Sequence, residues 1–293
     1  MQILIHGIAF LLLGILVSGG DVSASAQNRF RLREGDVVVF AGGTNMVRLQ
    51  RAGYLETMLT RKFAGVRPRF RDFAWEADTV FRQGTVIERW RKDGYRDVKG
   101  LGDLNTQLRR VNATMVIAQF GRLESMSGVA GLERFTDAYG QLIDRFQQHG
   151  RMVILVTPAP FEKSPGPEAP DPDRRNRDLA EYVQAIAGIA RDRQLICVDL
   201  FTAADPELTD NGIHIRPAAQ KKIAEVIAEQ LGCEPAGPWK LETLRQAVIE
   251  KHRLWYDYWR PANWKLLFGD DAKRQFTRGG KDSLPFREEW QTL

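Results

Sequence analysis

The sequence predicts an α/β protein in which a parallel sheet lies between two layers of helices. Short, continuous apolar runs, which are typical of strands covered on both faces, alternate with amphipathic segments of helical period. Such alternation gives a parallel sheet with right-handed crossovers. The first apolar run stops at a Gly-Gly pair and continues as a helical pattern, as in a strand–turn–helix unit. We therefore expect a three-layer α/β/α sandwich, followed by an aromatic-rich helical extension.

Residues 1–26 are predicted to be a signal peptide outside this fold. Ile3–Val17 is almost wholly apolar but shorter than the roughly 20 residues that a spanning helix needs. It is followed by Ala24-Ser25-Ala26, a small-x-small cleavage pattern. The amino end lacks Lys and Arg, so an uncleaved anchor stays open as the alternative. Cleavage predicts an exported protein, periplasmic or extracellular, with no stable membrane span.

Composition narrows the classes of partner. The net charge is +5, but Arg and Lys are spread beside Glu and Asp without interleaved aromatic residues, which excludes a nucleic-acid-binding platform. Cys197 and Cys233 are the only cysteines, and no Cys or His spacing indicates a metal. No metal or other cofactor is predicted. A disulfide between the two cysteines and a small core role for Cys197 both stay open.

The opening unit, Asp36–Leu59, carries the first strand and the first helical pattern. Val37–Phe40 is the strand, and Thr44 lies at the turn that follows. Arg67–Phe73 alternates basic and apolar residues, as a half-buried strand does. A loop from Ala74 follows it.

The rest of the domain repeats the alternation of strand and helix. Continuous apolar runs predict strands at Thr114–Phe120, Met152–Val156 and Leu195–Leu200. Apolar residues at helical spacing predict helices at Leu104–Val111, Leu132–Gln148, Arg177–Asp192 and Ala218–Leu231. Between them, the proline-dense Thr157–Asp173 can form neither helix nor central strand, and we expect a long ordered loop over the carboxyl ends of the strands.

We place the domain at residues 27–236 and the extension at residues 237–293. The extension has a helical stretch near Leu241–Trp259 and is rich in aromatic residues: Trp239, Trp255, Tyr256, Tyr258, Trp259, Trp264 and Trp290. Two interpretations stay open. The extension packs on its own domain, or it offers a surface to a protein partner or a second copy.

Thr44 and His214, from opposite ends of the domain, are the candidate chemical groups. The carboxyl ends of parallel strands meet at one edge of a sheet, so the loops that carry these residues are expected to converge. A hydroxyl beside a histidine suggests nucleophilic catalysis. His214 would take the hydroxyl proton, and a carboxylate just upstream would orient the ring.

The chain resembles the SGNH (GDSL) hydrolase family over Gly35–Leu231. The resemblance rests on VVFAGGTNMVRLQRAGYLETML, FRDFAWEADTVF, VIAQFGRLESMSG and LTDNGIHIRPAA. The segment NRDLAEYVQAIAGIARDRQLICVDLF is similar to members found in planctomycete-type bacteria. The family consists of exported esterases and carbohydrate-ester deacetylases. The resemblance thus implies a flavodoxin-like sheet and a small ester or carbohydrate-type ligand.

Two of the family's motifs depart from the usual pattern near the nucleophile. The first motif, Gly-Asp-Ser, is Gly42-Gly43-Thr44 here, and the extra methyl group of threonine restricts χ1. The second motif supplies a glycine N–H to the oxyanion hole, and the matching residue is Ala74.

The other two motifs depart at the oxyanion donor and at the acid. The third, Gly-x-Asn-[Asp/Glu], is Gly121-Arg122-Leu123-Glu124, and leucine cannot donate a hydrogen bond. Losing one such donor typically costs about 2.7–4 kcal/mol of transition-state stabilisation. The fourth, Asp-x-x-His, places Asn211 three residues before His214, with Asp210 one position further away. Either residue is a candidate to orient the ring.

Each candidate also has a purely structural interpretation. Thr44 can cap the following helix. His214 can be a hydrogen-bonded turn residue, and Glu124 a loop residue. Arg122 can attract an anionic ligand or face solvent. The neighbouring carboxylates Glu76 and Asp78 can contact a ligand or lie at the surface.

Two functions follow. The first is a pseudo-hydrolase that binds a ligand or partner, with weak or no ester hydrolysis. The alternative is an active esterase on carbohydrate acetyl esters or small esters. Its catalytic residues would be Thr44, His214 and Asp210 or Asn211, and its oxyanion and substrate edge would be formed by Gly43, Ala74, Gly121, Leu123 and Glu124.

Overall fold

The computed structural model describes residues 30–83, 103–164, 171–204, 207–234 and 240–259. The predicted signal peptide, together with Trp239, Trp264 and Trp290, lies outside the described residues. Over these ranges, no helix is both long and apolar enough to cross a membrane.

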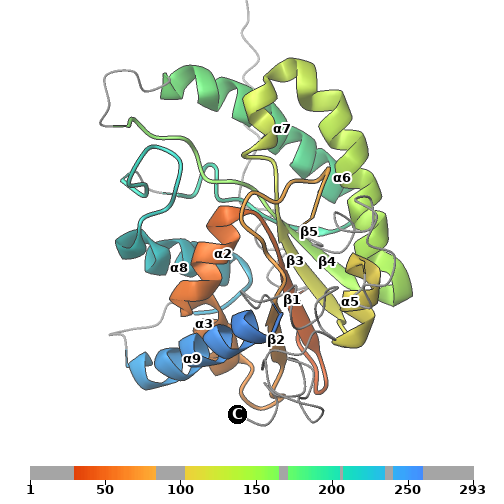
Figure 1. Cartoon of the computed structure of the whole chain (residues 1–293), viewed down its shortest axis with the longest axis vertical. Helices are drawn as coiled ribbons and strands as arrows, with labels where there is room; N and C mark the ends of the chain where they lie inside the picture. The colour runs from red at the N-terminus through yellow and green to blue at the C-terminus, as the bar shows by residue number, and fades with distance from the viewer. Residues whose placement is uncertain (1–29, 84–102, 165–170, 205–206, 235–239, 260–293) are drawn as a thin grey trace, which may run out of the picture.

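A five-stranded parallel sheet forms the centre of the molecule (Figure 1). Its strands are β1 (Val37–Gly42), β2 (Arg69–Asp72), β3 (Met115–Gln119), β4 (Met152–Val156) and β5 (Ile196–Val198). They lie in the order β2-β1-β3-β4-β5. This order confirms the expected flavodoxin-like sheet, in which the polarity of connection changes between β1 and β3.

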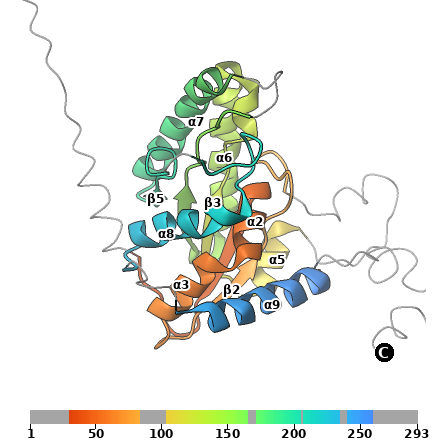
Figure 2. The same ribbon diagram turned by 90° about the vertical axis from the view of Figure 1, so that its left-hand side faces the viewer.

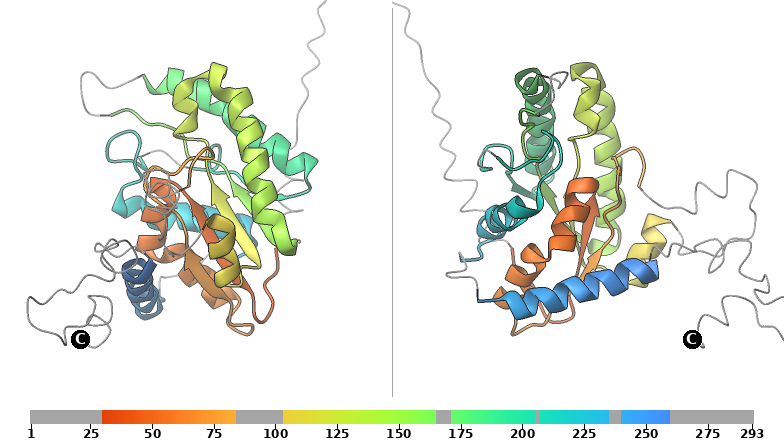
Figure 3. Two further views of the ribbon diagram at one scale, coloured as in Figure 1. Left: turned by 45° about the vertical axis from the view of Figure 1, so that its right-hand side comes forward. Right: turned by 60° about the vertical axis from the view of Figure 1, so that its left-hand side comes forward.

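Helices cover both faces of the sheet, as Figures 2 and 3 show. One layer contains α2 (Thr44–Ala52), α3 (Tyr54–Lys62) and α8 (Gln220–Gln230). The other contains α5 (Leu104–Arg110), α6 (Leu132–Gln147) and α7 (Pro172–Asp192). Short 3₁₀ turns follow β3, α6 and the loop that carries His214: η1 (Glu124–Ser127), η2 (Val129–Gly131), η3 (Gln148–Gly150) and η4 (Pro217–Ala219).

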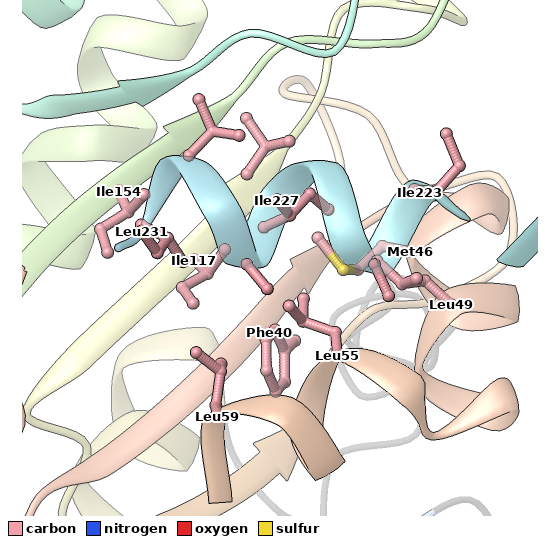
Figure 4. Packing of buried hydrophobic residues seen from close by; sticks show 14 of the residues in the cluster. Phe40, Met46, Leu49, Leu55, Leu59, Ile117, Ile154, Ile223, Ile227 and Leu231 are labelled. Atoms are coloured by element: carbon pink, nitrogen blue, oxygen red, sulfur yellow. The ribbon is translucent and has the colours of Figure 1, made fainter. Parts of the chain in front are cut away.

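Each face of the sheet has its own hydrophobic core. On β1, Phe40 packs with one cluster and Val39 with the other, because successive side chains of a strand point to opposite faces. Figure 4 shows the first cluster, where Phe40 and Ile117 of the sheet meet Leu55 of α3 and Ile227 of α8. A strand buried on both faces must be apolar at every position, which explains the continuous Val37–Gly42 run.

Two differences from the predictions go beyond small shifts at the ends of elements. The helical pattern that ends at Leu59 is two helices, because Gly53 adopts φ +73° and ends α2 before α3 begins. The predicted end of the proline-rich loop at Asp173 and the predicted start of the next helix at Arg177 are also wrong, because α7 begins at Pro172. Asp171 accepts a hydrogen bond from the N–H of Asp173 as the N-cap residue. Proline is well suited to the first helical position, where no N–H donor is needed.

Cys197 and Cys233 are both free thiols. Cys233 belongs to the first core cluster and Cys197 packs against the second. Burial raises the pKa of the Cys197 thiol to about 12 and that of Cys233 to about 11, so both are inert at neutral pH. The core interpretation of Cys197 therefore fits the structure.

Helix α9 (Glu242–Trp259) packs on α2, α3 and β2. Glu56 of α3 is buried and pairs with Lys251, and Nε2 of His252 lies 3.0 Å from its Oε2. The indole N–H of Trp255 donates to the carbonyl of Asp72 at 2.8 Å. This part of the extension therefore packs on its own domain.

Candidate functional site

A pocket of about 210 Å³ opens at the carboxyl ends of β1 and β3. It brings Thr44 and His214 together from opposite ends of the domain. Of the other predicted site residues, it is also lined by Gly43, Gly121, Leu123 and Glu124. Apolar side chains from Phe120, Met126, Pro158 and Ile213 form much of the remaining wall. Polar and charged residues complete it: Asn45, Asp78, Gln119 and Arg122, together with Ala77.

Thr44 is the first residue of α2, and Gly43 occupies the N-cap position. The Thr44 hydroxyl accepts a hydrogen bond from the N–H of Ala77 at 3.2 Å, so it binds the loop after β2. The interpretation of Thr44 as the helix cap is therefore wrong. The hydroxyl proton remains available to donate.

Gly43 approaches the backbone of that same loop closely. A Cβ atom at this position would lie 3.0 Å from the carbonyl oxygen of Asp78. This contact is tighter than side-chain carbons normally tolerate, so the loop around Asp78 accounts for glycine where the family has aspartate. Asp78 is buried and lines the pocket, whereas Glu76 lies at the surface and pairs with Arg51 at 2.7 Å.

Asn211 is the residue that contacts the ring of His214. Its Oδ1 accepts hydrogen bonds from the N–H of Ile213 at 3.2 Å and from the N–H of His214 at 2.8 Å. Its Nδ2 therefore faces Nδ1 of His214, at 3.1 Å. Because an amide nitrogen only donates, Nδ1 must accept, and the proton of the neutral ring lies on Nε2.

The pKa of His214 is lowered from its ordinary value. Burial of the ring is the main cause, and the positive charges of Arg48 and Arg122 add to it against the opposing charge of Asp210. His214 is consequently a neutral imidazole at neutral pH.

The carboxylate of Asp210 contacts Arg48 rather than the His214 ring. Nη1 of Arg48 lies 3.3 Å from Oδ2 of Asp210 and also donates to the carbonyl of Ile215 at 3.3 Å. Sequence reasoning missed Arg48. The available signal was its position one helical turn after Thr44, on the same side of α2.

Glu124 joins two loops. Its Oε1 accepts from the N–H of Val80 at 2.7 Å, and its Oε2 accepts from the N–H of Gly121 at 2.9 Å. Burial raises the pKa of Glu124, although both backbone hydrogen bonds favour the carboxylate. The N–H of Gly121 is therefore engaged by the protein itself.

The expected role of Ala74 is corrected by the structure. Ala74 is fully buried, is absent from the pocket lining, and donates its N–H to Oδ1 of Asp72 at 2.9 Å. The carboxylate at the end of β2 holds this N–H, and the chain reaches the pocket only three residues later, at Ala77.

Leu123 lies at the pocket and is 45% exposed. An apolar side chain thus occupies the position where the family has its asparagine donor. Within the part of the chain that the structure describes, no group of three or more His, Cys, Asp or Glu side chains is arranged to hold a metal ion.

Comparisons with known proteins agree with this architecture. The family model for GDSL-like lipases and acylhydrolases matches residues 34–227. No curated protein sequence matches the chain. Fifty-nine chains of solved structures match.

Three of these structures illustrate the likeness. A gut microbial diltiazem-metabolizing enzyme has a TM-score of 0.53 at 15% identity, over 71% of this chain and 49% of its own. This chain thus spans about half of that enzyme's length. A putative GDSL-like lipase from Parabacteroides merdae has a TM-score of 0.50 at 13% identity, over 70% of this chain and 99% of its own. An acetylxylan esterase from Geobacillus stearothermophilus has a TM-score of 0.47 at 17% identity, over 70% of this chain and 98% of its own. At such identities the likeness of the first two shows the fold alone.

Proposed function

The chain belongs to the GDSL-like lipase/acylhydrolase family, and we propose that it binds a small ligand at the carboxyl edge of its sheet with weak or no ester hydrolysis. The hydrogen bond from the Asn211 amide to Nδ1 of His214 carries this proposal.

That hydrogen bond leaves His214 without a basic nitrogen for the Thr44 hydroxyl. Activation of a hydroxyl nucleophile requires a nitrogen lone pair directed at its proton. Here Nδ1 accepts from Asn211, so Nε2 carries a proton and donates. The amide is not free to rotate, because its Oδ1 holds two backbone N–H groups. In the serine-protease triad, an amide in place of the orienting acid lowers kcat by about 10⁴-fold.

The donors that would stabilise an oxyanion are also reduced. Leu123 removes a side-chain donor, worth about 2.7–4 kcal/mol in comparable enzymes. The N–H groups of Ala74 and Gly121 donate to carboxylates of the protein. The lost base and the lost donors act on the same transition state through different groups, so the free-energy costs add and their effects on the rate multiply.

The chemistry of the pocket favours a small ligand that carries an oxygen acceptor and an apolar group. The Thr44 hydroxyl and the Nε2–H of His214 are donors, whereas Leu123, Met126 and Ile213 offer apolar surface. The carboxyl group of Glu124 is bound to backbone N–H groups. An ester or a carbohydrate derivative has the matching carbonyl or hydroxyl oxygen.

An active esterase remains the second candidate, favoured by the presence of Thr44 and His214 in one pocket. It would act on carbohydrate acetyl esters or small esters. Its mechanism requires the ring proton of His214 to move to Nδ1, with Asp210 released from Arg48 to accept it.

Hydrolysis of p-nitrophenyl acetate and of acetylated xylo-oligosaccharides by the mature protein separates the two candidates. The pseudo-hydrolase predicts background rates that do not change in Thr44→Ala and His214→Ala variants. Turnover that both substitutions abolish would establish the esterase. A Thr60→Ala variant on α3 serves as the control for nonspecific effects.

Export and partner binding are further parts of the proposal. Residues 1–26 would be removed during export to the periplasm or beyond, which amino-terminal sequencing of the secreted protein tests. Residues 237–293 would offer a surface to a partner or a second copy. On the described part of this segment, Leu254 of α9 is 55% exposed and is the position at which such a surface can be tested. Light scattering of the native protein and a Leu254→Glu variant measures any self-association.

A further inference from the structure

Arg122 is a buried cation whose hydrogen-bond acceptors are backbone carbonyls from two distant loops. It is 9% exposed and donates through Nη1 to Ala159 at 2.7 Å and through Nη2 to Pro160 at 3.1 Å. Nη2 also donates to the carbonyl of Gly212 at 3.2 Å. The guanidinium lies 4.5 Å from the centre of the Phe161 ring. One side chain from the end of β3 therefore holds both the loop after β4 and the turn before His214.

Glu162, in the same loop after β4, also binds that turn, but as an acceptor of hydrogen bonds. Its carboxylate accepts hydrogen bonds from the N–H of Leu208 at 2.8 Å and from the N–H of Thr209 at 2.7 Å. Its own N–H donates to the carbonyl of Gly212 at 3.0 Å. The carbonyl of Gly212 thus accepts from both Glu162 and Arg122.

Gly212 itself leaves no room for the turn to move closer. Its φ is +76°, and a Cβ atom would lie 2.4 Å from the carbonyl oxygen of Glu162. The backbone of the turn is therefore in direct contact with the loop after β4, two residues before the imidazole.

We propose that Arg122 is a positioning residue that fixes residues 208–215, and with them His214, over the pocket through the loop after β4. Glu162 is its counterpart in that loop. The two charges act on backbone groups of opposite polarity, the cation on carbonyls and the carboxylate on N–H groups.

The chemistry of arginine explains why this position is not a lysine. A planar guanidinium carries five N–H donors and can bond several carbonyls in fixed directions, whereas an ammonium is a compact point charge. Burial lowers the pKa of Arg122 to about 10, and the group stays charged at neutral pH. Its hydrogen bonds are therefore charge-assisted, which makes them stronger than neutral ones.

The inference does not depend on the proposed function, because it concerns where His214 is held and not what His214 does. Of the two interpretations of Arg122 left open by the sequence, the structure contradicts the first, because the residue is 9% exposed and does not face solvent. Arg122 also lines the pocket, so its role in positioning the turn is compatible with the second, attraction of an anionic ligand.

Native-state hydrogen exchange of the backbone N–H groups of residues 208–215 tests the proposal, with Arg122→Gln and Arg122→Lys variants. Losing hydrogen bonds to a charged group, at about 1.5–3 kcal/mol, predicts exchange about ten- to a hundredfold faster in this turn for Arg122→Gln. The Nδ1 resonance of His214 should shift in the same variant, because the Asn211 contact loosens. Arg122→Lys keeps the charge but not the fork of donors, and should also accelerate exchange.

Arg71→Gln is the matched control. Arg71 likewise donates to a carbonyl, that of Phe70 at 2.8 Å, and lies 5.0 Å from the Trp255 ring, but it belongs to β2. It should lower overall stability without selective acceleration in residues 208–215. The proposal is overturned if Arg122→Lys and Arg122→Gln leave exchange in this turn unchanged. It is also overturned if they accelerate exchange only as much as Arg71→Gln does. Should Arg122→Gln fail to fold, Arg122→Lys decides by the same criterion.

Discussion

Nδ2 of Asn211 lies 3.1 Å from Nδ1 of His214, while Oδ1 of the same amide accepts hydrogen bonds from two backbone N–H groups. The orientation of the amide is thereby fixed, and with it the tautomer of the ring. A histidine in the position of a general base consequently presents a proton to the pocket instead of a lone pair.

Replacing Asn211 with aspartate should reverse this tautomer. One carboxylate oxygen keeps the hydrogen bonds from the backbone N–H groups of Ile213 and His214. The other accepts a hydrogen bond from a protonated Nδ1. A nearby carboxylate favours the imidazolium, so the pKa of His214 should rise from its lowered value. Titration of the ring protons by NMR measures the shift. Asn112→Asp adds the same charge at a turn after α5 and should leave the pKa unchanged. Equal titration of His214 in native protein and Asn211→Asp would contradict the assignment.

Restoring the family's catalytic groups together should create ester hydrolysis. The triple variant Thr44→Ser, Leu123→Asn, Asn211→Asp regains a nucleophile without the crowding methyl group, an oxyanion donor and an orienting acid. One oxyanion donor alone is worth about 10²–10³ in kcat, so we expect p-nitrophenyl acetate turnover at least about a hundredfold above the native protein. The same triple variant with His214→Ala is the control. If the triple variant hydrolyses ester no faster than this control, the missing groups are not what limits activity.

Gly212→Ala should destabilise the protein more than Gly150→Ala does. Both glycines have nearly the same φ, +76° and +73°, but a Cβ at Gly150 meets nothing within 4 Å. The left-handed backbone costs about 1–2 kcal/mol in each variant. The clash with the Glu162 carbonyl should add about 1–3 kcal/mol for Gly212→Ala. Urea denaturation gives both values, and equal losses would show that the turn moves freely away from Glu162.

Glu56 should be the main electrostatic attachment of α9. Removing one partner of a fully buried ion pair typically costs about 3–5 kcal/mol. The Lys251 side chain is 35% exposed and can regain water, so Glu56→Ala should lose at most about 3 kcal/mol of stability. The matched control is Glu242→Ala, whose partner Arg245 also belongs to α9. The Glu242 side chain is 51% exposed, and such a pair contributes about 1 kcal/mol or less. If Glu56→Ala loses no more stability than the control, the Glu56–Lys251 pair does not hold α9 on the domain.

The same pair gives stability a defined dependence on pH. Burial alone would raise the pKa of Glu56, but His252 and Lys251 outweigh it and hold the value below 4.5. Since the folded pKa lies below the unfolded one, the contribution is complete above pH 4.5 and is lost as pH falls through the folded value. Denaturation curves measured on either side of this range should show the loss in native protein. It should be absent in Glu56→Gln.

The layers of the fold were predictable because the strands inside the sheet must be apolar on both faces, whereas the edge strand β2 alternates basic and apolar residues. Val37–Phe40 and Met152–Val156 contain little except β-branched and aliphatic residues, and both form strands. The break between α2 and α3 was less visible, since a single glycine, Gly53, is compatible with both a continuous and a broken helix. Pro172 was placed in a loop because proline density concealed its suitability for the first helical position.

The candidate site was predictable as a set of loops and not as a set of contacts. Thr44 and His214 meet because strand ends converge, which topology alone dictates. Asp210 and Asn211 differ by one position in a turn, and side-chain-to-backbone bonds decide which of them contacts the ring. The partners of Arg122 lie 37, 38 and 90 residues away in the sequence, so no local pattern reveals them.

Determining which ring nitrogen of His214 carries the proton tests the central claim most directly. Long-range ¹H–¹⁵N NMR, recorded above the titration of the ring, distinguishes the two neutral tautomers. The hydrogen bond from Asn211 predicts a protonated Nε2 and an accepting Nδ1 in the native protein, with the reverse in Asn211→Asp. A native His214 that carries its proton on Nδ1, leaving Nε2 as a base for Thr44, would contradict the pseudo-hydrolase account.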